Sequence, residues 1–291
     1  MEEYRKSNHT VSAKGKQLLS FLAISVYLLA LLAPICVWAQ NGKPPVYLEV
    51  ISYKINPGKE DTYRNLVRNY GHRVYESVVR DKKIMGWYFY EVLMTPDTKN
   101  GYDFATVLIT TNFSDLIDNP VSRKDIYTKV ITGSKELSYQ QFMTQLQECR
   151  TVVNREIYVH RAGLDPKTPV SKYVQIDFMK PLPGKAADYV RMESEVFYPI
   201  HQERIKIGAL TDWALYEKLL PFTGDSRNDF VTANFFDNPR SIIDPKYEEA
   251  FNNIPNNIDF IRLSGQIDQT RKLVKSDIWK LVDYVDQMSL K

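Results

Sequence analysis

The chain has 291 residues, of which 44% are hydrophobic and 25% are charged, which is typical of a globular protein of one or two domains. Four of its 38 basic residues and two of its 35 acidic residues lie within the first 39 positions, so the remainder is close to neutral. A neutral chain lacks the basic field that attracts nucleic acid or an anionic membrane surface. We therefore exclude nucleic acid as a partner, and we exclude a membrane as a partner of the region after residue 39.

Residues 1–39 are predicted to be a signal peptide rather than part of the fold. Two lysines precede an apolar run at 18–35, and Val37-Trp38-Ala39 places small side chains where a signal peptidase needs them for a cut after Ala39. We therefore expect an exported protein, either periplasmic or secreted. Two alternatives remain open, namely an uncleaved membrane anchor through residues 18–35 and a lipoprotein anchored through Cys36.

The rest of the chain contains an internal repeat with an offset of 126 residues. Residues 57–113 and 183–239 share 12 identities in 57 positions without a gap. Unrelated segments of this length would share roughly three or four, so we infer a tandem duplication. The most informative identical pairs are Trp87/Trp213, Tyr90/Tyr216, Glu91/Glu217 and Pro57-Gly58-Lys59/Pro183-Gly184-Lys185.

The spacing of apolar residues predicts the same elements in each copy. The first copy is predicted to contain a strand at 46–55, a helix to about residue 80, strands at 84–94 and 102–111, a helical region at 121–147 broken near Gly133, and a strand at 151–158. The second copy is predicted to contain a strand at 172–180, a helix at 184–207 kinked at Pro199, strands at 210–220 and 228–236, a helical region at 240–274, and a strand at 277–286.

The element order β-α-β-β-α-β in each copy predicts an α+β fold. This order is the split unit of ferredoxin-like folds, in which helices cover one face of a four-stranded sheet. We expect the repeats at 46–164 and 172–290 to pack sheet to sheet as an α+β barrel with the helices outside. One chain can complete such a barrel alone, so both a monomer and a homodimer remain open.

The tandem units resemble the dimeric α+β barrel superfamily, which includes the antibiotic-biosynthesis monooxygenases and the NIPSNAP proteins. Two short motifs carry the resemblance, namely Tyr53 followed by Pro57-Gly58-Lys59, and Gly86-Trp87 followed by Glu91. The resemblance covers nearly all of residues 46–286. It implies an α+β barrel, but the activities in this superfamily are so varied that it implies no single reaction.

Alternation along the strands separates two faces of each sheet. We expect the apolar face to lie under the helices, and in the first strand of each copy this face carries Val46, Leu48 and Val50, or Val174, Ile176 and Phe178. The opposite face is expected to line the barrel interior. It supplies ten candidate site residues: Tyr47, Glu49, Trp87, Glu91, Phe104, Tyr173, Asp177, Trp213, Glu217 and Phe230.

Aromatic walls with a few convergent carboxylates are typical of a small-molecule pocket. Glu91 and Glu217 are the candidate catalytic residues, because burial would raise the pKa of a carboxyl group and let it act as a general base. The other eight residues are the candidate ligand-binding residues. In the structural alternative, Glu91 and Glu217 pair with Arg155 or Lys280, and the two tryptophans serve only as core.

No cofactor or metal ion is predicted. The four histidines have no metal-ligand spacing, and the sequence has no glycine-rich phosphate loop, serine nucleophile motif or zinc signature. The resemblance includes haem-binding proteins with an axial histidine, and in this chain the ligand would have to be His160 or His201. No local motif supports either residue.

The leading hypothesis is an exported protein that binds a small molecule inside its barrel. The first alternative is a cofactor-independent, monooxygenase-like enzyme with Glu91 or Glu217 as base. The second alternative is a structural protein with a solid core, in which Trp87 and Trp213 fill the barrel.

Overall fold

The computed structural model describes residues 44–96, 101–118, 123–133, 135–163, 170–222, 228–254 and 260–290. Pro45–Lys291 forms one compact unit, which is the subject of this section. The predicted signal peptide lies outside the described residues, as does most of the linker between the repeats. None of the helices in the described ranges is both long and apolar enough to span a membrane.

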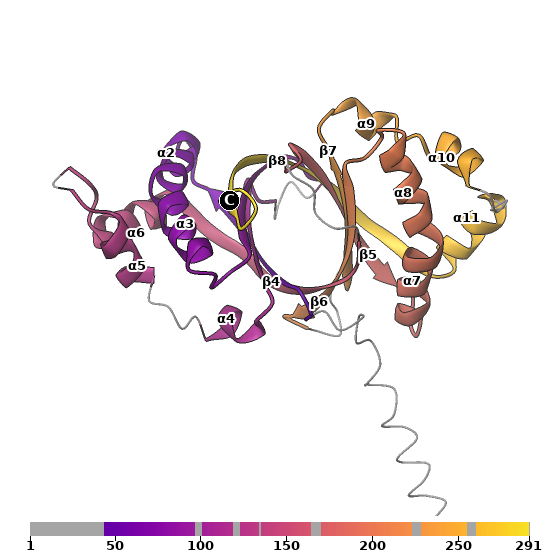
Figure 1. Cartoon of the computed structure of the whole chain (residues 1–291), viewed down its shortest axis with the longest axis horizontal. Helices are drawn as coiled ribbons and strands as arrows, with labels where there is room; N and C mark the ends of the chain where they lie inside the picture. Colours follow the sequence, from indigo (N-terminus) through magenta and orange to yellow (C-terminus); the bar gives the residue numbers. More distant parts are fainter. Residues whose placement is uncertain are drawn as a thin grey trace, which may run out of the picture. The chain divides into compact units, whose positions relative to one another are not determined.

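Strands from both copies form one closed barrel (Figure 1). Their order around the barrel is β1-β3-β2-β8-β5-β7-β6-β4, with every neighbouring pair antiparallel. The bounds are β1 Tyr47–Ile55, β2 Gly86–Met94, β3 Phe104–Thr110, β4 Arg150–Gly163, β5 Tyr173–Pro181, β6 Asp212–Leu220, β7 Phe230–Phe236 and β8 Arg271–Asp286.

The last strand of each copy joins the two halves of the barrel. β4 pairs with β1 of its own copy and with β6 of the other, while β8 pairs with β5 and β2. Moving four places around the ring carries β1 to β5, β3 to β7 and β2 to β6 without reversing the order. The halves are therefore related by an approximate twofold axis along the barrel axis, so equivalent residues lie at the same end on opposite walls.

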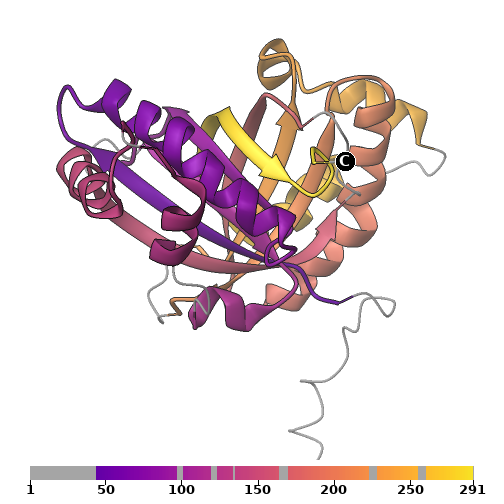
Figure 2. The same ribbon diagram turned by 60° about the vertical axis from the view of Figure 1, so that its left-hand side comes forward.

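Helices cover the outside of the barrel, those of the first copy on one side and those of the second copy on the other (Figures 1 and 2). The first copy contributes α2 Glu60–Leu66, η3 Val67–Gly71, α3 His72–Arg80, α4 Phe113–Ile117, α5 Arg123–Val130 and α6 Tyr139–Cys149. The second copy contributes α7 Ala186–Met192, η4 Glu193–Phe197, α8 Tyr198–Lys206, α9 Arg240–Ile243, α10 Tyr247–Asn253 and α11 Phe260–Asp268.

The predicted fold class, the tandem duplication and the barrel are confirmed. The long first helix contains a π-helical turn in both copies, at Val67–Gly71 and Glu193–Phe197, at the same offset as the sequence repeat. The first of these turns contains no proline, so Pro199 is not the general cause of the irregularity. β4 and β8 are longer than predicted: the additional residues of β4 pair with β6 of the other copy, whereas those of β8 pair with β5 of its own copy.

The sheet separates an inner core from two outer cores. The inner core draws residues from all eight strands and from no helix, which places it inside the barrel. The outer cores combine strand residues with residues of the covering helices, one for each copy. The buried members of the inner core are Leu48, Tyr90, Ala105, Tyr158, Val174, Ile176, Phe178, Val231, Ala233 and Trp279.

The sequence-based assignment of the two faces is therefore wrong. Leu48 and Val174, expected under the helices, face the barrel interior. Trp87 instead stacks on Tyr75 of α3 with ring centroids 4.7 Å apart, and Trp213 stacks on His201 of α8 at 4.6 Å. Mainly β-branched and small side chains line the narrow barrel, whereas many of the large aromatic rings fill the space between helices and sheet.

Candidate functional site in the barrel interior

The two predicted catalytic residues lie outside the barrel and apart from each other. The Glu91 carboxylate pairs with Nη2 of Arg64 at 2.9 Å, and Glu217 pairs with Nε of Arg161. Neither partner is the one expected from the sequence, since Arg155 pairs with Glu49 instead. Each glutamate is thus a partly exposed ion-pair partner, and the two carboxylates do not converge on one pocket.

The eight predicted ligand-binding residues are likewise divided between the outer faces of the two halves. Phe104 and Phe230 contact the rings of Tyr63 and Tyr189, which are residues of the covering helices. Their companions have separate partners. Trp87 and Trp213 stack on helix residues. Tyr47 packs on Phe113, Tyr173 belongs to the second outer core, and Glu49 pairs with Arg155. Asp177 accepts hydrogen bonds from Gln175, Asn234 and Ser276.

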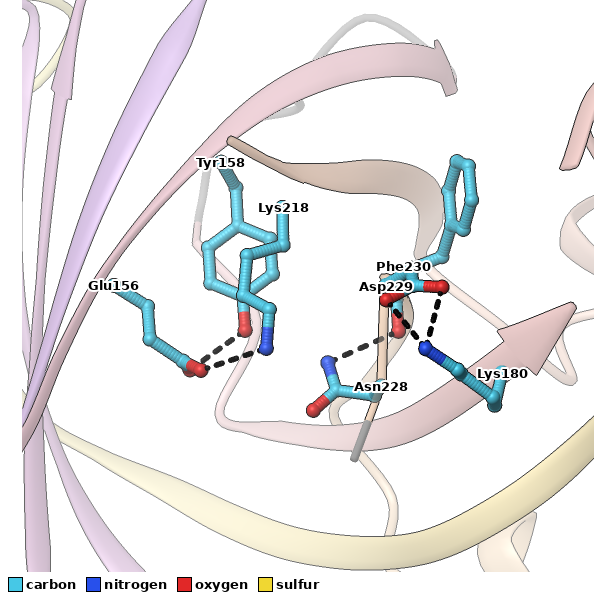
Figure 3. A network of polar contacts seen from close by, with 7 residues as sticks. All are labelled: Glu156, Tyr158, Lys180, Lys218, Asn228, Asp229 and Phe230. Carbon is cyan, nitrogen blue, oxygen red and sulfur yellow. Dashed lines mark hydrogen bonds and ion pairs between the residues drawn. The ribbon is translucent and has the colours of Figure 1, made fainter. Parts of the chain in front are cut away.

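The barrel interior contains a polar network that the sequence did not identify (Figure 3). The hydroxyl group of Tyr158 donates a hydrogen bond of 2.7 Å to the Glu156 carboxylate, and Nζ of Lys218 lies 3.2 Å from the same group. The side chains of Glu156 and Lys218 are only 13% and 6% exposed. Asn228 lies beside them, and its amide donates to the carbonyl oxygen of Phe230. Two charged residues are therefore nearly buried in a largely apolar barrel.

A second network occupies the equivalent place on the opposite wall. Asp277 accepts hydrogen bonds from the Tyr102 hydroxyl at 2.7 Å and from Nζ of Lys275 at 2.8 Å. Glu156 pairs with Val50 on β1 and Asp277 pairs with Ile176 on β5, so the two acids occupy equivalent positions of the repeat. Both networks consequently lie at the same end of the barrel.

The lysine and the tyrosine of each network come from different positions. Lys218 corresponds to Val92 in the first copy, and Tyr102 corresponds to Asn228 in the second. Both networks therefore contain a carboxylate, but its positively charged partner and its hydroxyl partner come from positions that are not equivalent in the two copies. A buried carboxylate requires such partners, because an unpaired charge in a low-dielectric interior is strongly destabilising.

The tyrosines of these networks remain protonated at neutral pH. Burial raises the pKa of Tyr158, and the nearby Glu156 carboxylate raises it further. The pKa of Tyr102 is raised in the same way, first by burial and then by Asp277. Both hydroxyl groups therefore act as hydrogen-bond donors to their carboxylates rather than as anions.

Two side chains in the middle of the barrel wall are only partly buried. Val50 and Val107 face each other across β1 and β3, and both belong to the inner core. An inward-facing residue in the middle of a closed barrel can be exposed only to space inside it, so some space adjoins these two side chains.

The described residues contain no metal-binding cluster, and the surroundings of His201 do not fit an axial haem ligand. They contain no group of three or more histidine, cysteine, aspartate or glutamate residues placed to hold a metal ion. His201 lies in the second outer half, where its ring stacks on Trp213 and its Nδ1 lies 3.1 Å from Nη1 of Arg204. Because the indole covers the imidazole ring, this arrangement does not fit an axial haem ligand.

The missed residues leave a weak signal in the sequence. Along β4, Glu156, Tyr158 and His160 alternate with Ile157 and Val159, which shows a polar face but not which side of the barrel it occupies. Lys218 follows Glu217 in the repeated motif and must therefore face the opposite side of the strand. Once Trp213 is known to lie outside, alternation alone places Lys218 inside.

Comparison with known proteins identifies the fold. No family model matches the chain, and no curated protein matches it. A proposed monooxygenase from Fusobacterium nucleatum has a similar structure, with a TM-score of 0.50, 11% identity, and coverage of 84% of this chain and 95% of the other. A proposed monooxygenase from Lactobacillus acidophilus is similar with a TM-score of 0.47, 10% identity, and coverage of 84% and 97%.

Identities this low establish architecture and not activity. A haem-binding protein from Thermus thermophilus is also similar, with a TM-score of 0.47, 9% identity, and coverage of 82% of this chain and 92% of the other. Together with the closed barrel of two ferredoxin-like repeats, the similarity to the Fusobacterium nucleatum structure shows that the chain has the dimeric α+β barrel fold, with both halves of the barrel in one polypeptide.

Proposed function

We propose that this protein is exported and binds a small, largely apolar molecule inside its barrel, with the Glu156–Tyr158–Lys218 network as the polar anchor. The observation that carries the proposal is the ion pair between Glu156 and Lys218, nearly buried in an apolar interior. Replacing a buried ion pair by apolar residues of similar volume is often neutral or stabilising, so stability alone is a weak reason for its presence.

The network has hydrogen-bonding capacity left for a ligand. An ammonium group carries three donors, and among the described residues Glu156 is the acceptor found for Lys218. Aromatic rings of the inner core, including Tyr90 and Trp279 with ring centroids 5.6 Å apart, supply flat apolar surface close by. This combination suits a planar ligand with more than one hydrogen-bonding group, of which one reaches the Lys218 network.

Two other functions receive less support. A cofactor-independent oxygenase would need a base in its pocket, but Glu91 and Glu217 are paired with arginines outside the barrel. A structural protein with a solid core would need Trp87 and Trp213 inside the barrel, and both pack against helices instead.

Ligand-induced thermal stabilisation, measured on the mature protein with a panel of aromatic alcohols, phenols and ketones, tests the binding proposal. Lys218→Met is expected to weaken the binding of hits by roughly tenfold, because a hydrogen bond to a charged group is lost. A double variant, Lys218→Met with Glu156→Leu, controls for the carboxylate left unpaired.

Lys54→Met is the matched control, since Lys54 also forms an ion pair, with Asp103 at 2.8 Å, but its side chain is 54% exposed. It should leave ligand binding unchanged. Absence of any stabilising ligand, or equal losses in the Lys54 and Lys218 variants, would contradict binding inside the barrel.

The export proposal rests on the apolar run at 18–35 and on Val37-Trp38-Ala39. Mass spectrometry of the protein recovered from cells should give a mature chain that begins at Gln40. A chain that keeps residues 1–39 would support the membrane anchor instead.

A further inference from the structure

The repeated motif that dominates the sequence places one tyrosine of each copy inside the barrel. Tyr90 and Tyr216 are identical residues at the repeat offset, and both belong to the inner core. They lie on β2 and β6 opposite Ala105 and Val231. Because the approximate twofold axis runs along the barrel, the two phenol rings project from opposite walls at the same level.

The hydroxyl groups of this pair have no protein partner among the residues that the structure describes. Other inward tyrosines are paired, since Tyr88 donates to Asp286 at 3.1 Å, and Tyr102 and Tyr158 donate to Asp277 and Glu156. Tyr90 is only 5% exposed and Tyr216 is partly buried, yet neither hydroxyl oxygen is among the described buried polar atoms that lack a partner. Both hydroxyl groups therefore face open space inside the barrel, where a ligand can reach them.

The two hydroxyl groups act as hydrogen-bond donors inside the same barrel. Burial raises the pKa of Tyr90 and of Tyr216, so both keep their protons at neutral pH. Both side chains belong to the inner core and occupy equivalent positions on opposite walls of the barrel. A group that accepts a hydrogen bond between the two walls could be held by both.

We infer that Tyr90 and Tyr216 form a paired donor site that binds the carbonyl oxygen of a planar aromatic ligand. This inference rests on the proposed binding function and specifies the ligand. A carbonyl oxygen has two lone pairs in one plane, which suit donors that approach from two sides. The rings of Trp279, 5.6 Å from Tyr90, and His160, 5.6 Å from Tyr216, provide flat surfaces for the rest of the ligand.

The charges around the pair favour a neutral carbonyl over a carboxylate. The positive charges of Lys218 and Lys275 are already balanced by Glu156 and Asp277. Burying an anion at the pair would therefore carry a desolvation cost that neither of these two networks offsets. A ketone or an aldehyde makes the same two hydrogen bonds without that cost.

Acetophenone and isopropenylbenzene test this inference directly, because they have the same shape and only the ketone has an acceptor oxygen. Their dissociation constants are measured on the mature protein by titration calorimetry. The wild-type protein is expected to bind acetophenone roughly tenfold or more tightly than the hydrocarbon, and the infrared carbonyl band of the bound ketone should shift to lower frequency.

Tyrosine-to-phenylalanine variants assign the preference to the two hydroxyl groups. Tyr90→Phe and Tyr216→Phe keep the rings, so folding should be retained, and each should reduce the preference by roughly threefold to fivefold. The double variant should bind both compounds equally and lose the infrared shift. Tyr284→Phe is the control, since its ring stacks on Tyr88 and its hydroxyl group is not part of the pair.

The outcomes separate the two levels of the proposal. Equal binding of ketone and hydrocarbon by the wild-type protein would overturn the paired donor site and leave the binding function intact. A preference that survives in the double variant would overturn it as well. If the wild-type protein binds neither compound nor any member of the aromatic panel, both the paired site and the binding function are wrong.

Discussion

The outer core of the first half is apolar at three positions where the second half carries polar side chains. Ile51, Val67 and Leu108 pack together in the first half. The equivalent residues of the second half are Asp177, Glu193 and Asn234, and the Asn234 amide donates to the Asp177 carboxylate at 3.1 Å. Inside the barrel the opposite holds, because both halves have kept an acid, at Glu156 and Asp277.

This contrast shows which parts of a duplicated fold are free to change. The outer cores need only fill the space between helix and sheet, and hydrogen bonds among the new polar groups offset much of the cost of burying them. The interior is shared by both halves, so a charge there affects the whole barrel.

Loss of the repeated tryptophans tests whether the halves are one unit. Trp87 and Trp213 are each 1% exposed, and replacement of either by alanine should lower the free energy of unfolding by about 3–5 kcal/mol. Because the strands of both halves close one barrel, each variant should shift a single urea unfolding transition. Two transitions, of which only one responds to each variant, would contradict a shared barrel.

The polar outer core should make the second half sensitive to pH. Burial raises the pKa of Glu193 to about 7 from a reference value of 4.5, with Asp177 raising it and Arg271 lowering it. The folded state therefore holds a proton that the unfolded chain releases. The free energy of unfolding should fall by roughly 3 kcal/mol as the pH rises from about 4.5 through about 7.

Glu193→Gln should remove that part of the pH dependence, as measured by urea unfolding of variant and wild type across this range. Glu195→Gln is the matched control, because Glu195 belongs to the same π-helical turn and is exposed. A wild-type slope that persists unchanged in the Glu193 variant would show that this carboxyl group is not the source.

Helix capping gives the smallest expected effect. Ser138 caps α6 in a reciprocal capping box with Gln141. Ser138→Ala should cost about 1 kcal/mol in the free energy of unfolding. Thr144→Ala, on an exposed position of α6, should change it by less than about 0.5 kcal/mol; equal effects of the two would argue against the cap.

The repeat and its element order could be predicted because both depend on local patterns. The 126-residue offset relates the two copies, and apolar periodicity locates nearly every strand and helix. The short helix α4 was missed, since its five residues are too few to show a period. The end of β4 was missed because it pairs with β6 of the other half, and the start of β8 was missed because it pairs with β5, which is distant in the sequence.

The site could not be predicted because alternation gives two faces without saying which one is inside. Both faces of β2 are compatible with a core, because one carries Trp87 and Phe89 and the other carries Tyr88 and Tyr90. Partners distant in the sequence decide the matter. Glu91 pairs with Arg64 of a covering helix, and Glu156 meets Lys218 from the other copy, and neither contact is encoded in a local pattern.

The central claim is that a ligand binds inside the barrel rather than beneath the helices. Trp279 faces the interior and Trp213 lies under α8, so two variants in which one of them is the single tryptophan of the mature chain, with Trp87 and the other replaced by phenylalanine, report on the two places separately. Titration of each variant with acetophenone should give saturable quenching of Trp279 fluorescence and only weak, linear quenching of Trp213. Saturable quenching of Trp213 with an unresponsive Trp279 would contradict the account.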